Sequence, residues 1–150
     1  MNKIWHIKEL DILIDYVRAN QGDKNIIFLH GDLGSGKTTF VRKYCEKINV
    51  INQVSSPSFL ILNSYNSASN MRINHFDFYR VEDFSELEMI GVNEILNESN
   101  SLTFIEWPDK FLEQLKIFKE KSFSIYFNFI RDNINPVSYT HLTLPTNREV

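Results

Sequence analysis

The segment GDLGSGKT, from Gly31 to Thr38, contains residue types that bind phosphate, at the spacing that this binding needs. It matches the pattern G-x-x-x-x-G-K-[ST] at every fixed position. The glycines allow consecutive backbone N–H groups to point at an anion, and a helix that begins near Lys37 adds its positive dipole end. In this pattern the lysine reaches the β- and γ-phosphates, and the Thr38 hydroxyl is a ligand of Mg²⁺. The sequence therefore predicts a nucleotide phosphate site.

The whole loop and the residue after it are expected to line the phosphates. These residues are Gly31, Asp32, Leu33, Gly34, Ser35, Gly36, Lys37, Thr38 and Thr39. The flanks agree with such a loop, because Ile26–Leu29 is apolar on both faces, like a strand of a covered parallel sheet, and a helix is expected to about Lys47. A glycine-rich turn that matches the pattern by chance is the alternative, and the flanks argue against it.

Two carboxylates follow strand-like segments and are candidates to complete this site. Glu106 follows the apolar run Leu102–Ile105, and Asp77 follows Ile73–Phe76. Ligands bind outside the carboxyl ends of parallel strands, so we expect Glu106 to emerge beside the phosphates as the acid on the metal side. Asp77 would then act on the attacking water or near the γ-phosphate, which makes Lys37, Asp77 and Glu106 the predicted catalytic residues. A turn residue or a helix cap is the alternative for either acid.

Residues close to Asp77 leave further alternatives open. Arg80 could neutralise phosphate charge, as an arginine finger does, or form a surface salt bridge. His75 alternates with Phe76 and Phe78, so we expect it to be packed rather than catalytic. The sequence has no cluster of His and Cys at the spacing of a metal site, which leaves Thr38 and Glu106 as the predicted metal ligands.

The remaining pattern predicts an α/β domain of the P-loop NTPase type, with a mostly parallel sheet flanked by helices and one antiparallel hairpin. The N-terminal region is expected to hold an edge strand at Ile4–Ile7 and a helix over residues 4–18, with Leu10, Leu13, Ile14 and Val17 inward. After the phosphate-loop helix we expect a hairpin of strands Phe59–Tyr65 and Met71–Tyr79, and one or two helices over Asp83–Leu96 with a break at Gly91. The remaining elements are a strand at Leu102–Ile105, a helix over Asp109–Lys119 and a strand over Ser122–Ile130. We expect a single domain over residues 1–135.

Composition narrows the class of protein. The 150 residues include one cysteine, Cys45, so an internal disulfide is excluded. No apolar run approaches the roughly 20 residues that span a bilayer, and the N-terminus lacks the features of a signal peptide. The net charge of −3 argues against binding nucleic acid through bulk positive potential. We expect a cytoplasmic protein with no membrane contact.

The last stretch, from Pro136 to Val150, does not fit this domain. It lacks helical or strand periodicity, and Val137–Leu142 resembles the translation of a sequencing-adapter end fused to a truncated reading frame. We therefore expect residues 136–150 to be non-native and disordered.

Several segments together resemble the TsaE family, the small ATPases of the bacterial machinery that makes threonylcarbamoyladenosine in tRNA. The segments are GDLGSGKTTFVR at 31–42, SSPSFLILNSY at 55–65, HFDFYRVED at 75–83, ELEMIGVNE at 86–94 and FIEWPDK at 104–110. The resemblance extends from about Ile26 to Lys110. The phosphate loop alone is common to a very large superfamily, whereas HFDFYR and EWP make the resemblance specific.

The resemblance implies roles for individual residues. Lys37 and Thr38 would bind the phosphates and Mg²⁺, Glu106 is similar to the family's metal-side glutamate, and Asp77 to its essential aspartate beside the γ-phosphate. Trp107 resembles the family's motif residue near the nucleotide. The segment Ser56–Phe59 resembles a switch-like SPTF loop, with Ser58 where threonine is usual. The serine keeps the hydroxyl and loses the stiffening β-methyl.

The resemblance also implies partners and cofactors. It implies an ATPase that uses ATP and Mg²⁺, whose turnover depends on docking to TsaD within a TsaB–TsaD assembly. Because the chain is acidic, we expect any contact with tRNA to run mostly through these partners.

Two other functions remain open. A small nucleoside or nucleotide kinase would share the phosphate loop, and Asp77–Arg80 loosely resembles the acid-plus-arginine signature of nucleoside kinases. Such enzymes need an arginine-bearing lid, and the segment after Asp83 has no arginine before Arg131. A nucleotide-sensing adaptor that does not hydrolyse ATP would share every residue of the loop, so only turnover separates it from an ATPase.

Overall fold

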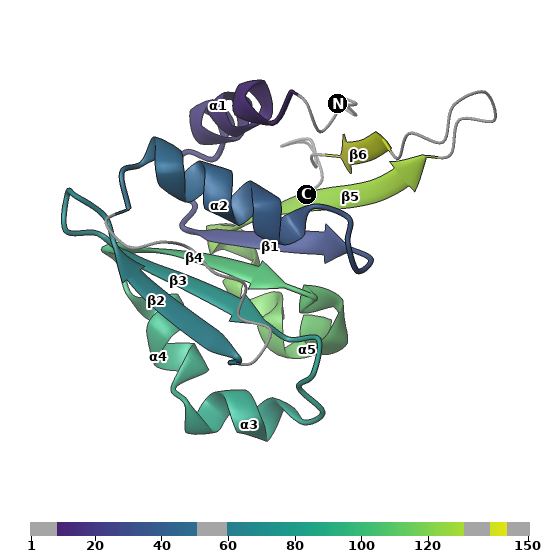
Figure 1. The fold of residues 1–150 in the computed structure, drawn as a ribbon. Helices are drawn as coiled ribbons and strands as arrows, with labels where there is room; N and C mark the ends of the chain where they lie inside the picture. The colour runs from purple at the N-terminus through teal and green to yellow at the C-terminus, as the bar shows by residue number, and fades with distance from the viewer. Residues whose placement is uncertain (1–8, 51–59, 131–138, 144–150) are drawn as a thin grey trace.

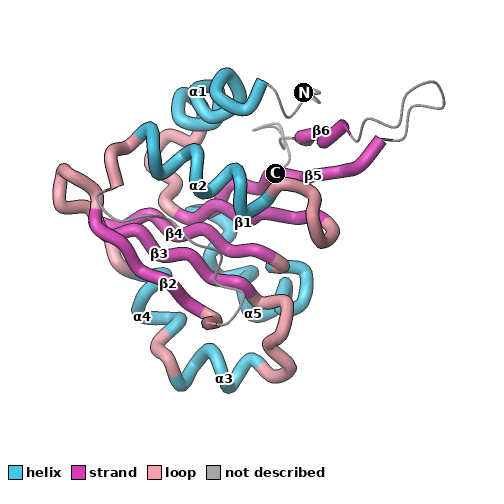
Figure 2. Tube along the Cα trace, in the orientation of Figure 1, coloured by secondary structure: helices cyan, strands magenta, loops and turns pink. Residues whose placement is uncertain are grey.

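The computed structural model describes residues 9–50, 60–130 and 139–143 as a sheet covered by helices (Figure 1). The strands are β1 (Ile26–Gly31), β2 (Leu62–Asn66), β3 (Arg72–Asp77), β4 (Ser101–Glu106), β5 (Ser122–Ile130) and β6 (Tyr139–Thr143). The helices are α1 (Leu10–Asn20), α2 (Lys37–Lys47), α3 (Phe84–Met89), α4 (Val92–Asn97) and α5 (Leu112–Leu115), with 3₁₀ turns η2 (Pro108–Phe111) and η3 (Lys116–Lys121) on either side of α5. Figure 2 shows the strands side by side between these helices.

The strands form one mixed sheet in the order β2-β3-β4-β1-β5-β6. The four inner strands, β3, β4, β1 and β5, are parallel, whereas β2 and β6 pair antiparallel at the two edges. The register places Asp77 beside Glu106, and Glu106 beside Leu29 of β1. The carboxyl ends of three neighbouring strands therefore meet at one edge, where an open α/β sheet binds its ligands.

Each face of the sheet has its own apolar core. On one face α1 and α2 pack on the strands around Phe40 and Phe104, both fully buried. On the other face α3, α4 and the helical segment around α5 pack around Phe76 and Phe78, which are also fully buried. Helices therefore cover both faces of the sheet, and this packing fixes the positions of the strand ends and of the side chains that they carry.

The predicted fold class is confirmed, as are several of its elements. The β2–β3 hairpin has the expected turn, and β5 has the expected bounds. Gly91 separates α3 from α4 with φ of 81°, a conformation that favours glycine. The inward residues of α1 are the four that the helical spacing predicts, Leu10, Leu13, Ile14 and Val17. Cys45 is fully buried as a packed residue, and burial raises the pKa of its thiol to about 12.

Three expectations differ from the structure. Strand β3 ends at Asp77, not at Tyr79, because the chain turns there. The helix expected over Asp109–Lys119 is three short helical pieces, since Phe111 leaves helical dihedrals where its ring packs against Phe78 at 5.8 Å. The expectation of disorder from residue 136 onward is wrong for Tyr139–Thr143, which pair with β5 as strand β6.

Two other expectations lie outside the described residues. They concern the edge strand at Ile4–Ile7 and the switch-like loop at Ser56–Phe59. That residues 136–150 are non-native stays a prediction. Within the described ranges, no helix is long and apolar enough to cross a membrane.

Candidate functional site

The phosphate loop connects the end of β1 to the start of α2, and two of its glycines are required by this geometry. A Cβ on Gly31 would lie 2.7 Å from the carbonyl oxygen of Phe127 and 2.9 Å from the Phe127 Cβ, so no larger residue fits. Gly36 precedes α2 with φ of 106°, where a side chain would be strained. The sharp turn between them brings the backbone of the loop round to the helix N-terminus.

Helix α2 begins at Lys37, where the motif predicts groups that bind an anion. The first N–H groups of a helix have no carbonyl partner within it, and the helix dipole favours negative charge there. Ser35 is buried and its N–H donates to the Asp32 carbonyl at 3.1 Å, which closes the turn. Asp32, Leu33 and Gly34 form its exposed rim, and Thr39 is half-buried in the first turn of the helix.

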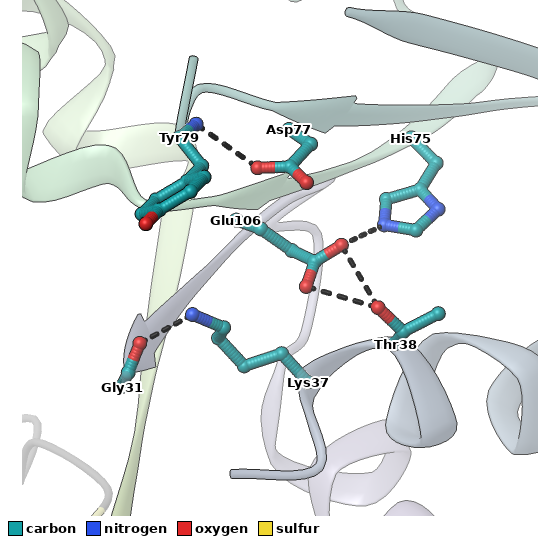
Figure 3. A network of polar contacts seen from close by, with 7 residues as sticks. All are labelled: Gly31, Lys37, Thr38, His75, Asp77, Tyr79 and Glu106. Carbon is teal, nitrogen blue, oxygen red and sulfur yellow. Dashed lines mark hydrogen bonds and ion pairs between the residues drawn. The ribbon is translucent and has the colours of Figure 1, made fainter. Parts of the chain in front are cut away.

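Lys37 extends from the start of α2 toward the Gly31 carbonyl at the end of β1 (Figure 3). Its side chain is buried, and Nζ donates a hydrogen bond to the Gly31 carbonyl. Nζ also lies 3.8 Å from the centre of the Trp107 ring, a cation–π contact. Burial lowers the pKa of Lys37, and the charges of Glu106 and Asp77 oppose that shift. A buried cation with these contacts is suited to receive an anion.

Glu106 lies at the end of β4 and is held by two neighbouring elements. Only 3% of the residue is exposed. The Thr38 hydroxyl donates to its carboxylate at 3.2 Å from Oε1 and 3.3 Å from Oε2, and His75 Nε2 lies 2.7 Å from Oε2. A buried carboxylate needs such donors to offset its loss of water. The structure therefore joins the loop, through Thr38, to the strand-end acid that the sequence predicted.

Asp77 lies beside Glu106 at the end of β3, in a different environment. It is half-buried, and its Oδ1 accepts a hydrogen bond from the backbone N–H of Tyr79 at 3.0 Å. Burial raises the pKa of Asp77 and the charge of Glu106 adds to this, whereas the hydrogen bond from Tyr79 lowers it. A carboxylate with a raised pKa and a partly open face can accept a proton more readily than an ordinary aspartate.

Trp107 closes one side of the site. It has φ of 61°, an uncommon conformation for a residue with a side chain, directly after β4. Its ring lies 5.1 Å from that of Tyr79 and over Lys37. Lys110 Nζ donates to the carbonyl of Tyr79 at 2.9 Å and to that of Val81, which ties the segment after β3 to the segment after β4. Trp107 thus lies against Lys37 of the phosphate loop, and its place near a nucleotide stays a prediction.

The structure brings Lys37, Thr38, Asp77 and Glu106 to one edge of the sheet (Figure 3). Arg80 is exposed and forms no salt bridge with any residue that the structure describes, and its role as an arginine finger stays a prediction. His75 is fully buried, as expected of a packed residue. Its contact with Glu106 is the feature that the sequence analysis missed. Alternation along a strand places residues two apart on one face, and that could have placed His75 on the face of Asp77.

The donor set at Thr38 and Glu106 fits Mg²⁺. This ion prefers oxygen ligands and is usually held by one or two carboxylates, several waters and substrate phosphates. A hydroxyl and a carboxylate oxygen about 3 Å apart, next to a phosphate loop, supply the protein's part of such a set. Among the described residues no three His, Cys, Asp or Glu side chains come together as a metal site. A cation here would therefore need phosphate and water as its other ligands.

Comparison with known proteins places this arrangement in a family. The family model "Threonylcarbamoyl adenosine biosynthesis protein TsaE" matches residues 6–133. The chain belongs to the TsaE family. Relatives named tRNA threonylcarbamoyladenosine biosynthesis protein TsaE include those of Haemophilus influenzae, 41% identical over 85 residues, and Borreliella burgdorferi, 36% identical over 105 residues. The TsaE of Bacillus subtilis is 37% identical over 97 residues.

The matches cover different shares of these TsaE proteins. They cover 57%, 70% and 65% of this chain, and 52%, 74% and 58% of the proteins from H. influenzae, B. burgdorferi and B. subtilis. The chain thus spans about half to three quarters of the length of the curated relatives it matches. The family model includes all of the predicted site residues, from Gly31 to Trp107.

Proposed function

We propose that this TsaE-family protein binds and hydrolyses ATP with Mg²⁺ as part of tRNA threonylcarbamoyladenosine biosynthesis. The observation that carries the proposal is the bond between Thr38 of the phosphate loop and the strand-end Glu106, with Lys37 and Asp77 within the same buried site. The family and the names of its relatives support the pathway.

The backbone of the loop and Lys37 would hold the phosphates of ATP. Phosphate oxygens would replace the Gly31 carbonyl as partners of the ammonium, which lies in a buried position where charge interactions are strong. Trp107 would keep Lys37 aligned through its ring. These groups position the nucleotide and offset its charge, which is most of what catalysis of phosphoryl transfer requires.

Thr38 and Glu106 would hold Mg²⁺ beside the phosphates. When bound there, the ion would supply neutralisation of the negative charge on the phosphate oxygens. Asp77 is the group that would orient the attacking water and accept its proton, because its pKa is raised and one face is open. The two acids are thus assigned separate tasks.

As partners we propose TsaD and TsaB, with tRNA reached only through them, and a cytoplasmic location. The support is the resemblance of the chain to partner-dependent ATPases. A site that needs a partner for full activity turns over slowly alone. The phosphate loop presents exposed residues such as Leu33, 62% exposed, which a partner could contact.

The test is ATP hydrolysis by the purified chain, alone and with TsaB, TsaD and tRNA. We expect hydrolysis to rise strongly with the partners and to be lost in Lys37→Ala. Glu113→Gln, an exposed acid on α5, is the control and should behave as the wild type. Nucleotide binding with unchanged, negligible hydrolysis in the presence of the partners would instead favour a nucleotide-sensing adaptor. Transfer of phosphate to a nucleoside would favour a kinase.

A further inference from the structure

His75 is buried against the strand-end acid in a way that simple packing does not explain. It has no exposed surface, and its side chain points to the same face of β3 as Asp77. Nε2 lies 2.7 Å from Glu106 Oε2. Nδ1 has no hydrogen-bond partner among the described residues. An apolar side chain would fill this position without burying an unpaired ring nitrogen, so the contact with Glu106 is what distinguishes histidine here.

The chemistry of the two groups sets the direction of the hydrogen bond. A carboxylate can only accept, so we assign His75 the tautomer with its proton on Nε2, from which the ring donates to Glu106 Oε2. In that tautomer Nδ1, which has no hydrogen-bond partner among the described residues, carries a lone pair and no proton. This bond fixes Oε2 on the side of β3, while the Thr38 hydroxyl contacts both oxygens from α2. The carboxylate is therefore held from two sides in one orientation.

We propose that His75 is a positioning residue that orients the Glu106 carboxylate toward Thr38 for Mg²⁺. The inference rests on the proposed function, because it assigns Glu106 and Thr38 to the metal. Without the Nε2–H donor, the one hydrogen bond to the Glu106 carboxylate that remains within the described part of the chain is that of the Thr38 hydroxyl, the same group that must also face the ion. Partners that orient metal ligands typically contribute about 10–100-fold to metal affinity or activity.

A second buried histidine provides a matched control. His30 is 7% exposed, and its Nδ1 lies 2.8 Å from Asp109 Oδ1, with Nε2 3.3 Å from Ser124 Oγ. Its ring stacks on Tyr126 at 4.3 Å. His30 thus resembles His75 in burial and in having a carboxylate partner, yet within the described part of the chain its ring nitrogens bond to Asp109 and Ser124 rather than to Thr38 or Glu106.

The experiment measures the binding of a non-hydrolysable ATP analogue by calorimetry, in EDTA and across a Mg²⁺ titration, using the full chain. In His75→Leu we expect the Mg²⁺ concentration at half effect to rise about 10–100-fold, with analogue affinity in EDTA unchanged. His75→Gln, which keeps an N–H donor near the position of Nε2, should recover most of the loss. His30→Leu should match the wild type. The EDTA measurement verifies that each variant is folded, because it depends on the loop and Lys37.

Two results would overturn the inference. One is an equal Mg²⁺ dependence in the wild type and His75→Leu, and the other is His75→Gln as impaired as His75→Leu. Nitrogen NMR of the imidazole gives an independent readout, because we expect the proton on Nε2 and a bare Nδ1, and a proton on Nδ1 would contradict the bond. If the wild type binds the analogue without any effect of Mg²⁺, the metal part of the proposed function fails and the inference fails with it. If the wild type binds no analogue at all, the proposal that this chain binds a nucleotide is wrong.

Discussion

Asp77 and Glu106 lie side by side at the ends of neighbouring parallel strands, but their burial and their hydrogen-bond partners differ. Glu106 is almost fully buried and accepts hydrogen bonds from α2 and from β3. Asp77 is half-buried and accepts one from the backbone two residues along its own chain. The sheet fixes where both carboxylates stand, whereas the side chains around each decide what it can do. A held carboxylate suits a metal, and a less constrained one with a raised pKa suits a proton.

Of the changes at these two acids, replacing Glu106 should have the largest effect on ATP hydrolysis. In Glu106→Gln we expect steady-state ATP hydrolysis, measured with the partner proteins, to fall by about 10³-fold, because a metal's contribution to phosphoryl transfer is several kcal/mol. Loss of the charge weakens the metal ligand while the amide keeps the volume of the side chain. Glu113→Gln is the matched control on α5. A decrease of less than threefold would remove Glu106 from the metal site.

Replacing Asp77 should have a smaller kinetic effect of a different kind. In Asp77→Asn we expect kcat to fall by about 10²-fold, within the range for loss of a general base, with KM nearly unchanged. The acid limb of the wild-type pH–rate profile should lie above the usual pKa range of an aspartate and be absent from the variant, because burial raises the pKa of Asp77. Asp11→Asn, on the exposed side of α1, is the control. If the acid limb of the profile is unchanged in Asp77→Asn, the ionisation that causes it belongs to another group.

The smallest expected effect is that of Asp77→Asn on stability, which should rise although activity falls. Because the folded state raises the pKa of Asp77, its contribution to stability is fully present below the unfolded pKa and is lost as the pH rises through the folded pKa. At pH 7 the buried charge therefore destabilises the fold. Asp77→Asn should raise Tm by about 1–3 °C at pH 7 and have less effect near pH 4. An equal shift at both pH values would show that ionisation is not the cause.

The sequence predicted the parts of the site that depend on local patterns. The loop from Gly31 to Thr38 is a continuous motif, and the acids Asp77 and Glu106 each follow an apolar strand, so chain order was enough to find them. The ranking of Glu106 as the metal-side acid agrees with its bond to Thr38, which is 68 residues away along the chain.

The parts that were missed depend on packing between elements. The contact of His75 with Glu106 needs the register of β3 on β4, which no local pattern contains. The region around Phe111 was expected as one helix, but Phe111 departs from helical dihedrals where its ring packs against that of Phe78. Strand β6 was missed because Tyr139–Thr143 has little alternation, and pairing with the edge of β5 supplies its order.

The central claim is that the two acids have separate tasks, with Glu106 on the metal and Asp77 on the water. The most direct measurement is the affinity of a non-hydrolysable ATP analogue, with and without Mg²⁺, in Glu106→Gln and Asp77→Asn. We predict that Glu106→Gln loses the increase in affinity that Mg²⁺ gives the wild type, while Asp77→Asn keeps it. Loss of that increase in Asp77→Asn, with its retention in Glu106→Gln, would contradict the account.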